Sequence, residues 1–221
     1  RFTGLSSKEM SEVIKNKRGR PRDPERMKRV IESASQHFLE QGFDRASMEA
    51  VAQNSGVSKM TLYNYFPSKS ILLEACVGCR TDAMFEAFNE NRLDPKQPEQ
   101  ALTLIGAQFL SLMRAEDVIR MHRMLYGLAT LHPEVCAGYF KAGPERVNAL
   151  VREFLSASVA AGQMQIDDIA MACDQFLSLF LGRPHLRATL GLGVPDAQHD
   201  QRLVTENVLL FLARYGSRKP V

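Results

Sequence analysis

The chain has 221 residues and a formal net charge of +3, with 45% apolar and 24% charged residues. This composition is typical of a soluble globular protein that is long enough to bury a core. No apolar run approaches the roughly 18 residues that a membrane-spanning helix needs, and the N-terminal stretch has no apolar signal core. We therefore expect a cytoplasmic protein with no membrane partner.

Basic residues are concentrated near the N-terminus. Residues 1–75 hold 13 basic and 9 acidic side chains, whereas residues 76–221 hold 15 and 16. The first 22 residues alone carry seven basic and two acidic side chains. An asymmetry of this kind is typical of an N-terminal part that binds nucleic acid.

The four cysteines, at positions 76, 79, 136 and 173, do not make a disulfide framework in a chain of this length. Cys76 and Cys79 form a CxxC pair. A redox site would need a lowered thiol pKa and a zinc site two further ligands, and no nearby Cys or His pair has the spacing for zinc. We favour a structural role for the pair and expect neither a metal nor a cofactor.

Residues 1–22 contain Gly, Ser and Pro and show little apolar periodicity, which predicts a flexible basic arm. Its end, Lys17-Arg18-Gly19-Arg20-Pro21-Arg22, resembles the Arg-Gly-Arg-Pro core of AT-hooks, which bind the DNA minor groove. Extended arginines suit a narrow, strongly negative minor groove, so we expect Arg18 and Arg20 to contact DNA. The alternative is a basic tail that only raises solubility.

The first helix is predicted from Pro24 to Gln41. Asp23 can cap it, and Pro24 fits the first turn, where no backbone N–H is needed. An apolar stripe at helical spacing is expected to face the core. It consists of Val30, Ile31, Ala34, Phe38 and Leu39. Gly42 then ends the helix, and Phe43 anchors the link that follows.

Residues 46–69, ASMEAVAQNSGVSKMTLYNYFPSK, predict two short helices joined by a tight turn. Ser47 and Ser58 are expected caps of the two helices, because a serine hydroxyl can accept from an unpaired backbone N–H. Gly56 lies where the chain reverses and can adopt the left-handed conformation that such a turn requires. The inward residues are Met48, Val51 and Ala52 in the first helix, and Leu62 and Phe66 in the second.

The second of these helices leaves a polar surface outside. Its outward residues are Lys59, Met60, Thr61, Tyr63, Asn64 and Tyr65. Such a surface suits the helix that a helix-turn-helix inserts into the DNA major groove. The stretch GVSKMTLYNYFPSK, from Gly56 to Lys69, resembles the signature of the TetR/AcrR family of bacterial one-component transcriptional regulators. The alternative is an ordinary helical hairpin with a glycine turn.

This resemblance implies an all-α fold in two parts. An N-terminal three-helix DNA-binding bundle with a helix-turn-helix occupies residues 23–69, and a larger helical ligand-binding and dimerisation domain occupies residues 70–221. A helix capped by Ser68 is expected to reach about Asn91 and to join the parts. Its inward residues are Ile71, Leu72, Ala75 and Cys76.

Contacts with DNA are assigned from side-chain type and from the matched positions of the motif. Lys59, Met60 and Thr61 are placed to meet base edges, since Lys can donate to guanine and the apolar Met and Thr methyl suit a thymine methyl. Tyr65 and Lys69 resemble phosphate contacts that fix register. The predicted DNA-binding residues are Arg18, Arg20, Ser47, Ser58, Lys59, Met60, Thr61, Tyr63, Asn64, Tyr65 and Lys69. Met60 departs from the smaller residue that many members carry there.

Further helices are predicted downstream, and no strand-like period is found. They cover Ala101–Met113, Asp117–Thr130, Glu134–Ala161 with a kink near Gly143-Pro144, Asp167–Leu181 and Asp196–Tyr215. The stretch from Gly182 to Gly193 is expected to be irregular. Segments at 132–134, 142–147, 175–177 and 185–187 resemble the C-terminal domain of AcrR-like members.

The family resemblance implies a homodimer joined by the last two long helices of each subunit. The candidate interface residues are Phe176, Phe180, Val208, Phe211 and Leu212. The alternative is that these residues fill the core of their own subunit, and we expect both uses.

The resemblance also implies a small effector ligand that changes the separation of the two DNA-binding heads. Large, adaptable apolar side chains suit an apolar or amphiphilic ligand. The candidates are Phe88, Phe109, Met113, Met121, Met124, Tyr126 and Phe176. Each could instead be a core residue, and His122 and His132 are either polar contacts to the ligand or structural histidines.

Taken together, these features predict a repressor that is released from a palindromic DNA operator by a small hydrophobic ligand, with an efflux transporter gene as a candidate target. The main alternative is a non-specific architectural DNA-binding protein without an effector. An enzyme is the other alternative. The sequence has no nucleophile elbow, no HExxH and no phosphate-binding glycine loop, so we expect no catalytic site.

Overall fold

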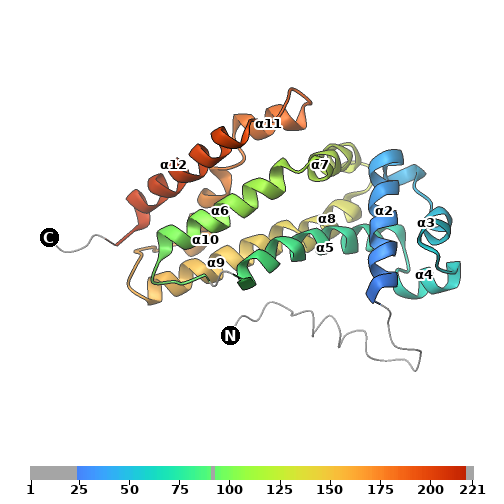
Figure 1. The fold of residues 1–221 in the computed structure, drawn as a ribbon, viewed down its shortest axis with the longest axis horizontal. Coiled ribbons are helices and arrows are strands. Elements are labelled where there is room, and N and C mark those ends of the chain that lie inside the picture. The colour runs from blue at the N-terminus through green and yellow to red at the C-terminus, as the bar shows by residue number, and fades with distance from the viewer. Residues whose placement is uncertain (1–23, 91–92, 218–221) are drawn as a thin grey trace. The chain divides into compact units, whose positions relative to one another are not determined.

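The computed structural model describes residues 24–90 and 93–217. Within these ranges the regular structure is helical, with one isolated β-bridge between Met164 and Gly216 (Figure 1). The all-α prediction is therefore confirmed. The predicted arm, with Arg18 and Arg20, and the predicted cap Asp23 lie outside the described residues.

The chain divides into two compact units, with the boundary between Cys76 and Val77 inside helix α5 (Lys69–Glu90). This boundary falls slightly after the predicted one at residue 69. The start of α5 belongs to the first unit, where Cys76 Sγ donates to Ile31 O over 3.7 Å. Of the CxxC pair, Cys76 is buried and Cys79 is exposed, so the two thiols do not share one environment.

The first unit consists of α2 (Pro24–Arg45), α3 (Met48–Ser55), α4 (Lys59–Tyr65) and the start of α5. Gly42 has φ 79° and ψ 168°, which interrupts the helical backbone of α2 although helical residues resume up to Arg45. This turn buries Phe43, whose ring stacks on that of Phe38 at 5.9 Å. The regular part of the first helix thus ends at Gly42, as predicted. Phe43 anchors the link that follows, as expected.

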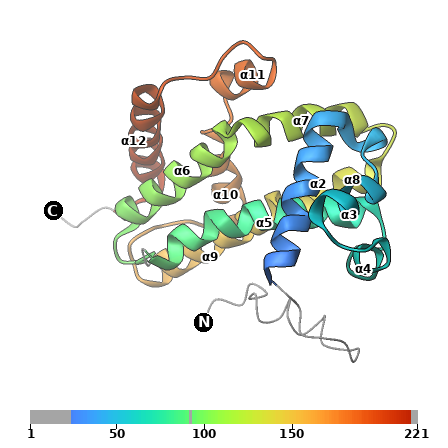
Figure 2. The ribbon, with the colours of Figure 1, turned by 45° about the vertical axis from the view of Figure 1, so that its right-hand side comes forward.

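The second unit contains the rest of α5 and the helices that follow it. These are α6 (Pro98–Arg114), α7 (Glu116–Leu128), α8 (Pro133–Ala142), α9 (Pro144–Ala160), α10 (Ile169–Ser178), α11 (Arg183–Thr189) and α12 (Ala197–Tyr215). Helix α12 packs beside α6, and α10 packs beside α9 (Figures 1 and 2). Asp168 and Asp196 cap α10 and α12 by accepting from backbone N–H groups.

Aromatic side chains fill the centre of the second unit. Phe176 is fully buried and lies edge-on to Phe180 at 5.3 Å and to Phe211 at 5.1 Å between ring centroids. Phe180 packs so closely on Gly106 that a Cβ at that glycine would come within 2.7 Å of the Phe180 ring. A residue without a side chain therefore allows α6 to approach the segment after α10 this closely.

Three details differ from the sequence-based expectations. The helix expected over 134–161 is two helices, because Gly143 leaves the helical conformation (φ −117°, ψ −82°) and Pro144 starts α9. The stretch 183–189, expected to be irregular, forms α11, which begins at Arg183 and Pro184. Ile71, expected to face inward, is 44% exposed, whereas Leu73 is buried.

Membrane insertion has no support among the described helices. None of them combines the length and the apolar character needed to cross a bilayer.

Candidate DNA-binding surface and ligand-binding region

The turn between α3 and α4 has the geometry of a helix C-cap followed by an immediate second helix. Gly56 is left-handed (φ 71°, ψ 29°), and its N–H donates to Gln53 O over 3.2 Å. Val57 N–H donates to Ala52 O over 3.0 Å. This pair of hydrogen bonds satisfies the last carbonyls of α3 and reverses the chain. The predicted role of Gly56 is confirmed.

Both predicted serine caps are confirmed. Ser47 Oγ accepts from Ala50 N–H over 3.1 Å, and Ser58 Oγ accepts from Thr61 N–H over 3.1 Å. Ser58 Oγ also lies 2.8 Å from Thr61 Oγ1. Two serines therefore fix where α3 and α4 begin, and the first turn of α4 is held by side-chain hydrogen bonds in addition to its backbone.

Helix α4 is held by a small apolar face and leaves its other residues outside. Leu62 is 1% exposed, and Phe66, directly after the helix, is 8% exposed. On the other side Met60 is 75% exposed and Tyr63 38% exposed. Lys59 and Asn64 are also exposed, and Thr61 and Tyr65 are half-buried. The structure therefore brings the predicted base-contacting residues together on the open face of α4.

Lys59 is oriented by a carboxylate of the neighbouring helix. Its Nζ forms an ion pair with Glu49, in the first turn of α3, and lies 5.8 Å from the centroid of the Tyr63 ring. The Lys59 ammonium lowers the pKa of the Glu49 carboxyl, and the Glu49 carboxylate raises the pKa of Lys59. Both side chains are more than half exposed, so the pair is weak and water or phosphate can compete for either partner.

Lys69 lies at the corner between α2 and α3. Its Nζ donates to Asp44 O over 2.9 Å and to Ala46 O over 3.1 Å, and it sits 4.7 Å from the centroid of the Phe43 ring. These contacts satisfy carbonyls where the chain leaves α2. Lys69 therefore stabilises the link between α2 and α3. Its predicted contact with a DNA phosphate stays a prediction.

Sequence reasoning missed His37, which joins α2 to α3. The ring is 8% exposed and is hydrogen-bonded to Gln41 Nε2 at 2.9 Å and to Asn54 Nδ2 at 2.8 Å. Asn54 is 17 residues away in the chain. A local helical period cannot reveal such a pairing, because it depends on how two helices cross.

Two family models match the chain. One, described as bacterial regulatory proteins of the tetR family, matches residues 30–76, which include α3 and α4. The other, described as the C-terminal domain of AefR-like transcriptional repressors, matches residues 100–217, more than half of the chain. The chain belongs to the TetR family. The helix-turn-helix predicted from Gly56–Lys69 is confirmed, and the C-terminal part is of the AefR-like type.

Individual relatives agree with this assignment. UidR of Escherichia coli K12, an HTH-type transcriptional regulator, is 27% identical over 109 residues, which cover 49% of each protein. The TetR-family chain thus spans about half the length of this curated relative. The flavonoid-responsive regulator FrrA is 28% identical, with a TM-score of 0.69, and the match covers 89% of this chain and all of FrrA.

A third comparison supports the fold alone. The structure of a protein described as a TetR-family transcriptional regulator from Mesorhizobium loti has a TM-score of 0.74 at 22% identity. The match covers 89% of this chain and all of that one. The arrangement of helices in a TetR-family protein therefore extends through nearly the whole chain.

The predicted ligand-binding residues of this TetR-family chain fall into two groups. Phe88, Phe109, Met113 and Phe176 belong to the buried core of the second unit. Met121 and Met124, in α7, are half-buried, and Tyr126 is 66% exposed. Burial therefore divides the seven residues between the interior and the surface of the second unit, and their role as a ligand site stays a prediction.

The predicted dimer residues lie mostly inside their own subunit. Phe176, Phe180, Val208 and Phe211 are at most 3% exposed, and Leu212 is half-buried. Side chains so buried within one copy are not on a surface that a second copy could contact. The large apolar residues that α10 and α12 do expose are Met171, Leu209 and Leu210, at 53%, 49% and 60%.

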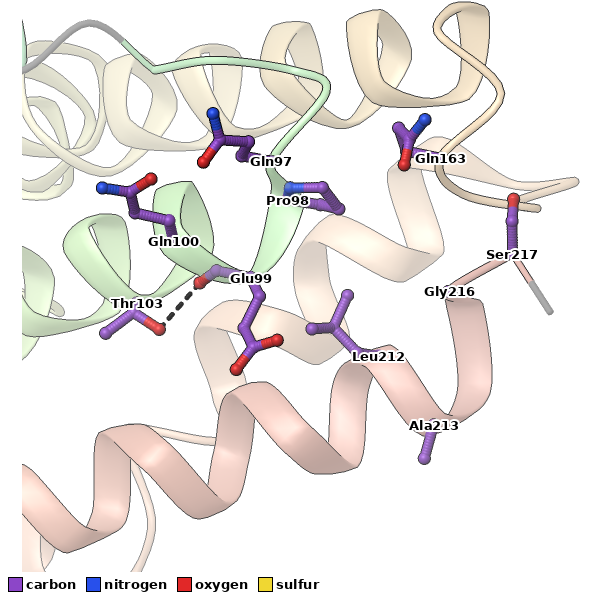
Figure 3. Close-up of a pocket in the computed structure, with 10 residues that line it drawn as sticks. All are labelled: Gln97, Pro98, Glu99, Gln100, Thr103, Gln163, Leu212, Ala213, Gly216 and Ser217. Carbon is purple, nitrogen blue, oxygen red and sulfur yellow. Dashed lines mark hydrogen bonds between the residues drawn. The ribbon is translucent and has the colours of Figure 1, made fainter. Parts of the chain in front are cut away.

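A cleft of about 800 Å³ lies in the second unit, between the start of α6 and the end of α12, and Figure 3 shows the residues that line it. It is open to solvent and lined by both polar and apolar groups, and none of the predicted ligand-binding residues lines it. The lining residues are Gln97, Pro98, Glu99, Gln100, Thr103, Gln163, Leu212, Ala213, Gly216 and Ser217. A cleft this open to solvent does not enclose a ligand in the way that the predicted effector would require.

A buried polar cluster forms where α6, α7 and α11 come together. His122 and His185, each 8% exposed, lie edge to face with ring centroids 5.7 Å apart, and His122 Nε2 is 2.6 Å from Tyr139 Oη. Arg114 donates from Nε and Nη2 to the Asp200 carboxylate over 3.1–3.4 Å. No group of three or more His, Cys, Asp or Glu suited to a metal occurs in the described ranges.

Proposed function

We propose that this chain is a one-component transcriptional repressor that binds an operator through α4 and is released by a small ligand. One observation carries the DNA-binding part of this proposal. A seven-residue helix is fixed by Leu62, Phe66 and two serine caps, and it exposes Lys59, Met60 and Tyr63 within the match to the tetR family model. A rigid helix with a polar outer face is what direct readout in the major groove requires.

The residues of α4 would divide between reading bases and holding the backbone. Lys59, Met60 and Thr61 lie in its first turn, which is the part of a recognition helix that meets base edges. Tyr63, Asn64 and Tyr65 follow and are placed for base or phosphate contact. Glu49 would hold Lys59 against α3 before DNA binds, and release it to a guanine or a phosphate with little loss, because the pair is exposed.

We propose that the repressor is a homodimer and that its operator is palindromic, since a twofold pair of heads reads two inverted half-sites. The exposed apolar residues Met171, Leu209 and Leu210 on α10 and α12 support a shared surface there better than the buried residues do. Charged substitution of Leu209 and Leu210 should yield monomers in sedimentation analysis. Charged substitution of Leu190, also exposed, is the matched control.

The effector is proposed to be apolar or amphiphilic and to bind in the second unit. Support comes from the apolar interior of that unit and from FrrA, which is described as flavonoid-responsive. A ligand changes DNA affinity only by its different affinity for the two conformations. An efflux transporter gene is our candidate target, on resemblance to efflux-pump regulators alone, and the site of action would be the cytoplasm, where bacterial DNA lies.

The deciding experiment selects genomic DNA fragments that bind the purified chain, and then measures affinity by fluorescence anisotropy for a selected duplex and a scrambled one. A repressor should keep an affinity ratio of about 10³ or more between the two duplexes as salt rises from 50 to 200 mM. Equal affinity for both duplexes at every salt concentration would instead identify an architectural DNA-binding protein and refute the repressor.

Lys59→Ala sharpens this test. We expect the variant to lose about 1–3 kcal/mol of binding free energy on the selected operator, and to tolerate other bases at one position of it. Lys141→Ala removes the same charge from an exposed position of α8 and is the matched control, expected to leave affinity unchanged. A uniform loss across all sequences for Lys59→Ala would reassign Lys59 to phosphate contact.

A further inference from the structure

The buried polar cluster of the second unit has hydrogen-bonding capacity that the protein does not use. Within the described ranges, four buried side-chain N or O atoms have no hydrogen-bond partner, and three of them belong to this cluster. These three atoms are Arg114 Nη1, His122 Nδ1 and His185 Nδ1. Their side chains are nine-tenths or more buried. Buried polar atoms in folded proteins are nearly always paired with protein, water or ligand, so this group points to a partner outside the protein chain.

The charges in the cluster cancel. The Arg114 guanidinium is neutralised by the Asp200 carboxylate, which it contacts through two of its nitrogens. Burial, together with the neighbouring His185, lowers the pKa of His122 to about 4, and burial with the nearby Arg114 also lowers the pKa of His185. Both imidazoles are therefore neutral near pH 7. A full negative charge brought to Arg114 would have to compete with the Asp200 carboxylate for the guanidinium.

The hydrogen-bonding pattern matches a hydroxyl group. Burial raises the pKa of Tyr139 to about 12, so its O–H stays protonated and can donate to His122 Nε2. In the tautomer in which Tyr139 O–H donates to His122 Nε2, His122 Nδ1 carries a proton and is a donor, as is Arg114 Nη1. A hydroxyl oxygen can accept from both, while its own proton is donated to His185 Nδ1 in the tautomer that leaves this nitrogen unprotonated.

Aromatic rings surround the same histidine. The Tyr139 ring lies edge-on to His122 at 5.8 Å, and the Tyr126 ring lies 6.4 Å from it. Tyr126 is 66% exposed, so this ring links buried His122 to the solvent-exposed surface. An aromatic ligand could reach His122 past Tyr126 and stack or pack edge-on among these rings.

We propose that Arg114, His122 and His185 form the polar end of the effector site and bind the hydroxyl of a neutral, phenol-type aromatic ligand. This inference rests on the proposed function, since it names the chemical class of the effector. Burying a hydrogen-bonded, unionised phenol costs little, whereas a carboxylate would lose its hydration and would have to compete with Asp200 for Arg114. A ligand without a hydroxyl would leave the three protein atoms unpaired.

The test uses the full chain and three naphthalene probes of similar size: 2-naphthol, 2-methoxynaphthalene and 2-naphthoate. Calorimetry should give binding of 2-naphthol at least tenfold tighter than that of either other probe. In a chain with ¹⁵N-labelled histidine, 2-naphthol should shift the imidazole signals of His122 and His185. The signal of the exposed His199 should not move.

Variants locate the binding. His185→Leu should weaken 2-naphthol binding at least tenfold, and His199→Gln, at an exposed position of α12, should leave it unchanged. If His185→Leu fails to fold by circular dichroism, the probe series and imidazole shifts on the native chain still decide. Equal binding of the three probes, tightest binding of 2-naphthoate, binding without imidazole shifts, or no binding of 2-naphthol would each overturn the proposal. Ordered water on the three atoms that 2-naphthol does not displace would do the same.

Operator binding is measured separately by anisotropy, so that failures can be told apart. If the chain binds 2-naphthol through the two histidines but binds no operator, the proposed hydroxyl-binding site stands and the repressor proposal is refuted. If the chain binds its operator but not 2-naphthol, the repressor proposal stands and the proposed hydroxyl-binding site is refuted.

Discussion

The two units use polar side chains in opposite ways. In the first unit the polar residues of α4 lie outside, and a few apolar contacts such as Leu62 hold the helix in place. In the second unit, Arg114, His122 and His185 lie inside, enclosed by several helices. An outward polar face follows from local sequence spacing. A buried polar cluster exists only once distant helices have packed, and it pays a desolvation cost that a solvent-exposed face does not.

The largest expected effect tests how far the second unit depends on its aromatic core. Phe176→Ala removes a fully buried ring that packs on Phe180 and Phe211, so we expect a loss of about 3–5 kcal/mol in the free energy of unfolding. Urea denaturation followed by circular dichroism measures it. Phe140→Ala, at a 55% exposed position of α8, is the matched control. Similar losses for both variants would contradict the assigned core.

In the first unit the comparison can be made within one helix. Leu62→Ala removes a side chain that is 1% exposed and should cost about 2–5 kcal/mol of stability, with a loss of DNA binding at temperatures where the unit then unfolds. Met60→Ala, two residues earlier and 75% exposed, should change stability by no more than about 0.5 kcal/mol. It should alter base preference instead. Thermal denaturation and anisotropy on the same samples separate the two roles.

Acid should destabilise the second unit through His122, one of its two buried histidines within the described residues. The pKa of His122 falls from an ordinary 6.5 to about 4 on folding, so the unfolded chain binds more protons between these values. Stability is then fully present above pH 6.5 and is lost as pH falls towards 4, by up to about 3 kcal/mol. Denaturation at a series of pH values measures this slope. His122→Gln should flatten it and His199→Gln should not, whereas a slope unchanged by His122→Gln would contradict the assignment.

The smallest expected effect compares two glycines. Gly56 has φ 71° and Gly127 lies in α7, and a Cβ at either position would meet no atom within 4 Å. Gly56→Ala should cost about 1–2 kcal/mol because an L residue is strained in the left-handed conformation. Gly127→Ala should gain up to about 1 kcal/mol, because Ala favours a helix. Differential scanning calorimetry measures both. Equal changes in stability for the two variants would show that the backbone conformation of the glycine does not determine the effect of the substitution.

The sequence predicted the first unit closely because its signals are local. A serine before each helix, Gly56 at the reversal and Leu62 four residues before Phe66 determine α3 and α4 with partners only a few residues away. The same reasoning failed at Gly143 and at residues 183–189, where a kink proved to be a break between two helices and an irregular stretch proved to be α11. At both positions a proline lies in the first turn of the new helix, and a proline can either interrupt a helix or start one, so the local signal alone does not distinguish the two outcomes.

By itself, the sequence determined that this is an all-α TetR-family chain with a helix-turn-helix whose outer face is Lys59, Met60, Thr61, Tyr63 and Asn64. Periodicity and capping suffice for the helices and their outer face, because each depends on residues within one or two turns, whereas the family came from the resemblance of the stretch Gly56–Lys69 to a known signature. Only the tertiary structure decided that Phe176 and Phe211 fill their own subunit, that His37 pairs with Asn54, and that Arg114, His122 and His185 meet in the interior. These contacts join residues far apart in the chain, and which side chains meet depends on how the helices cross.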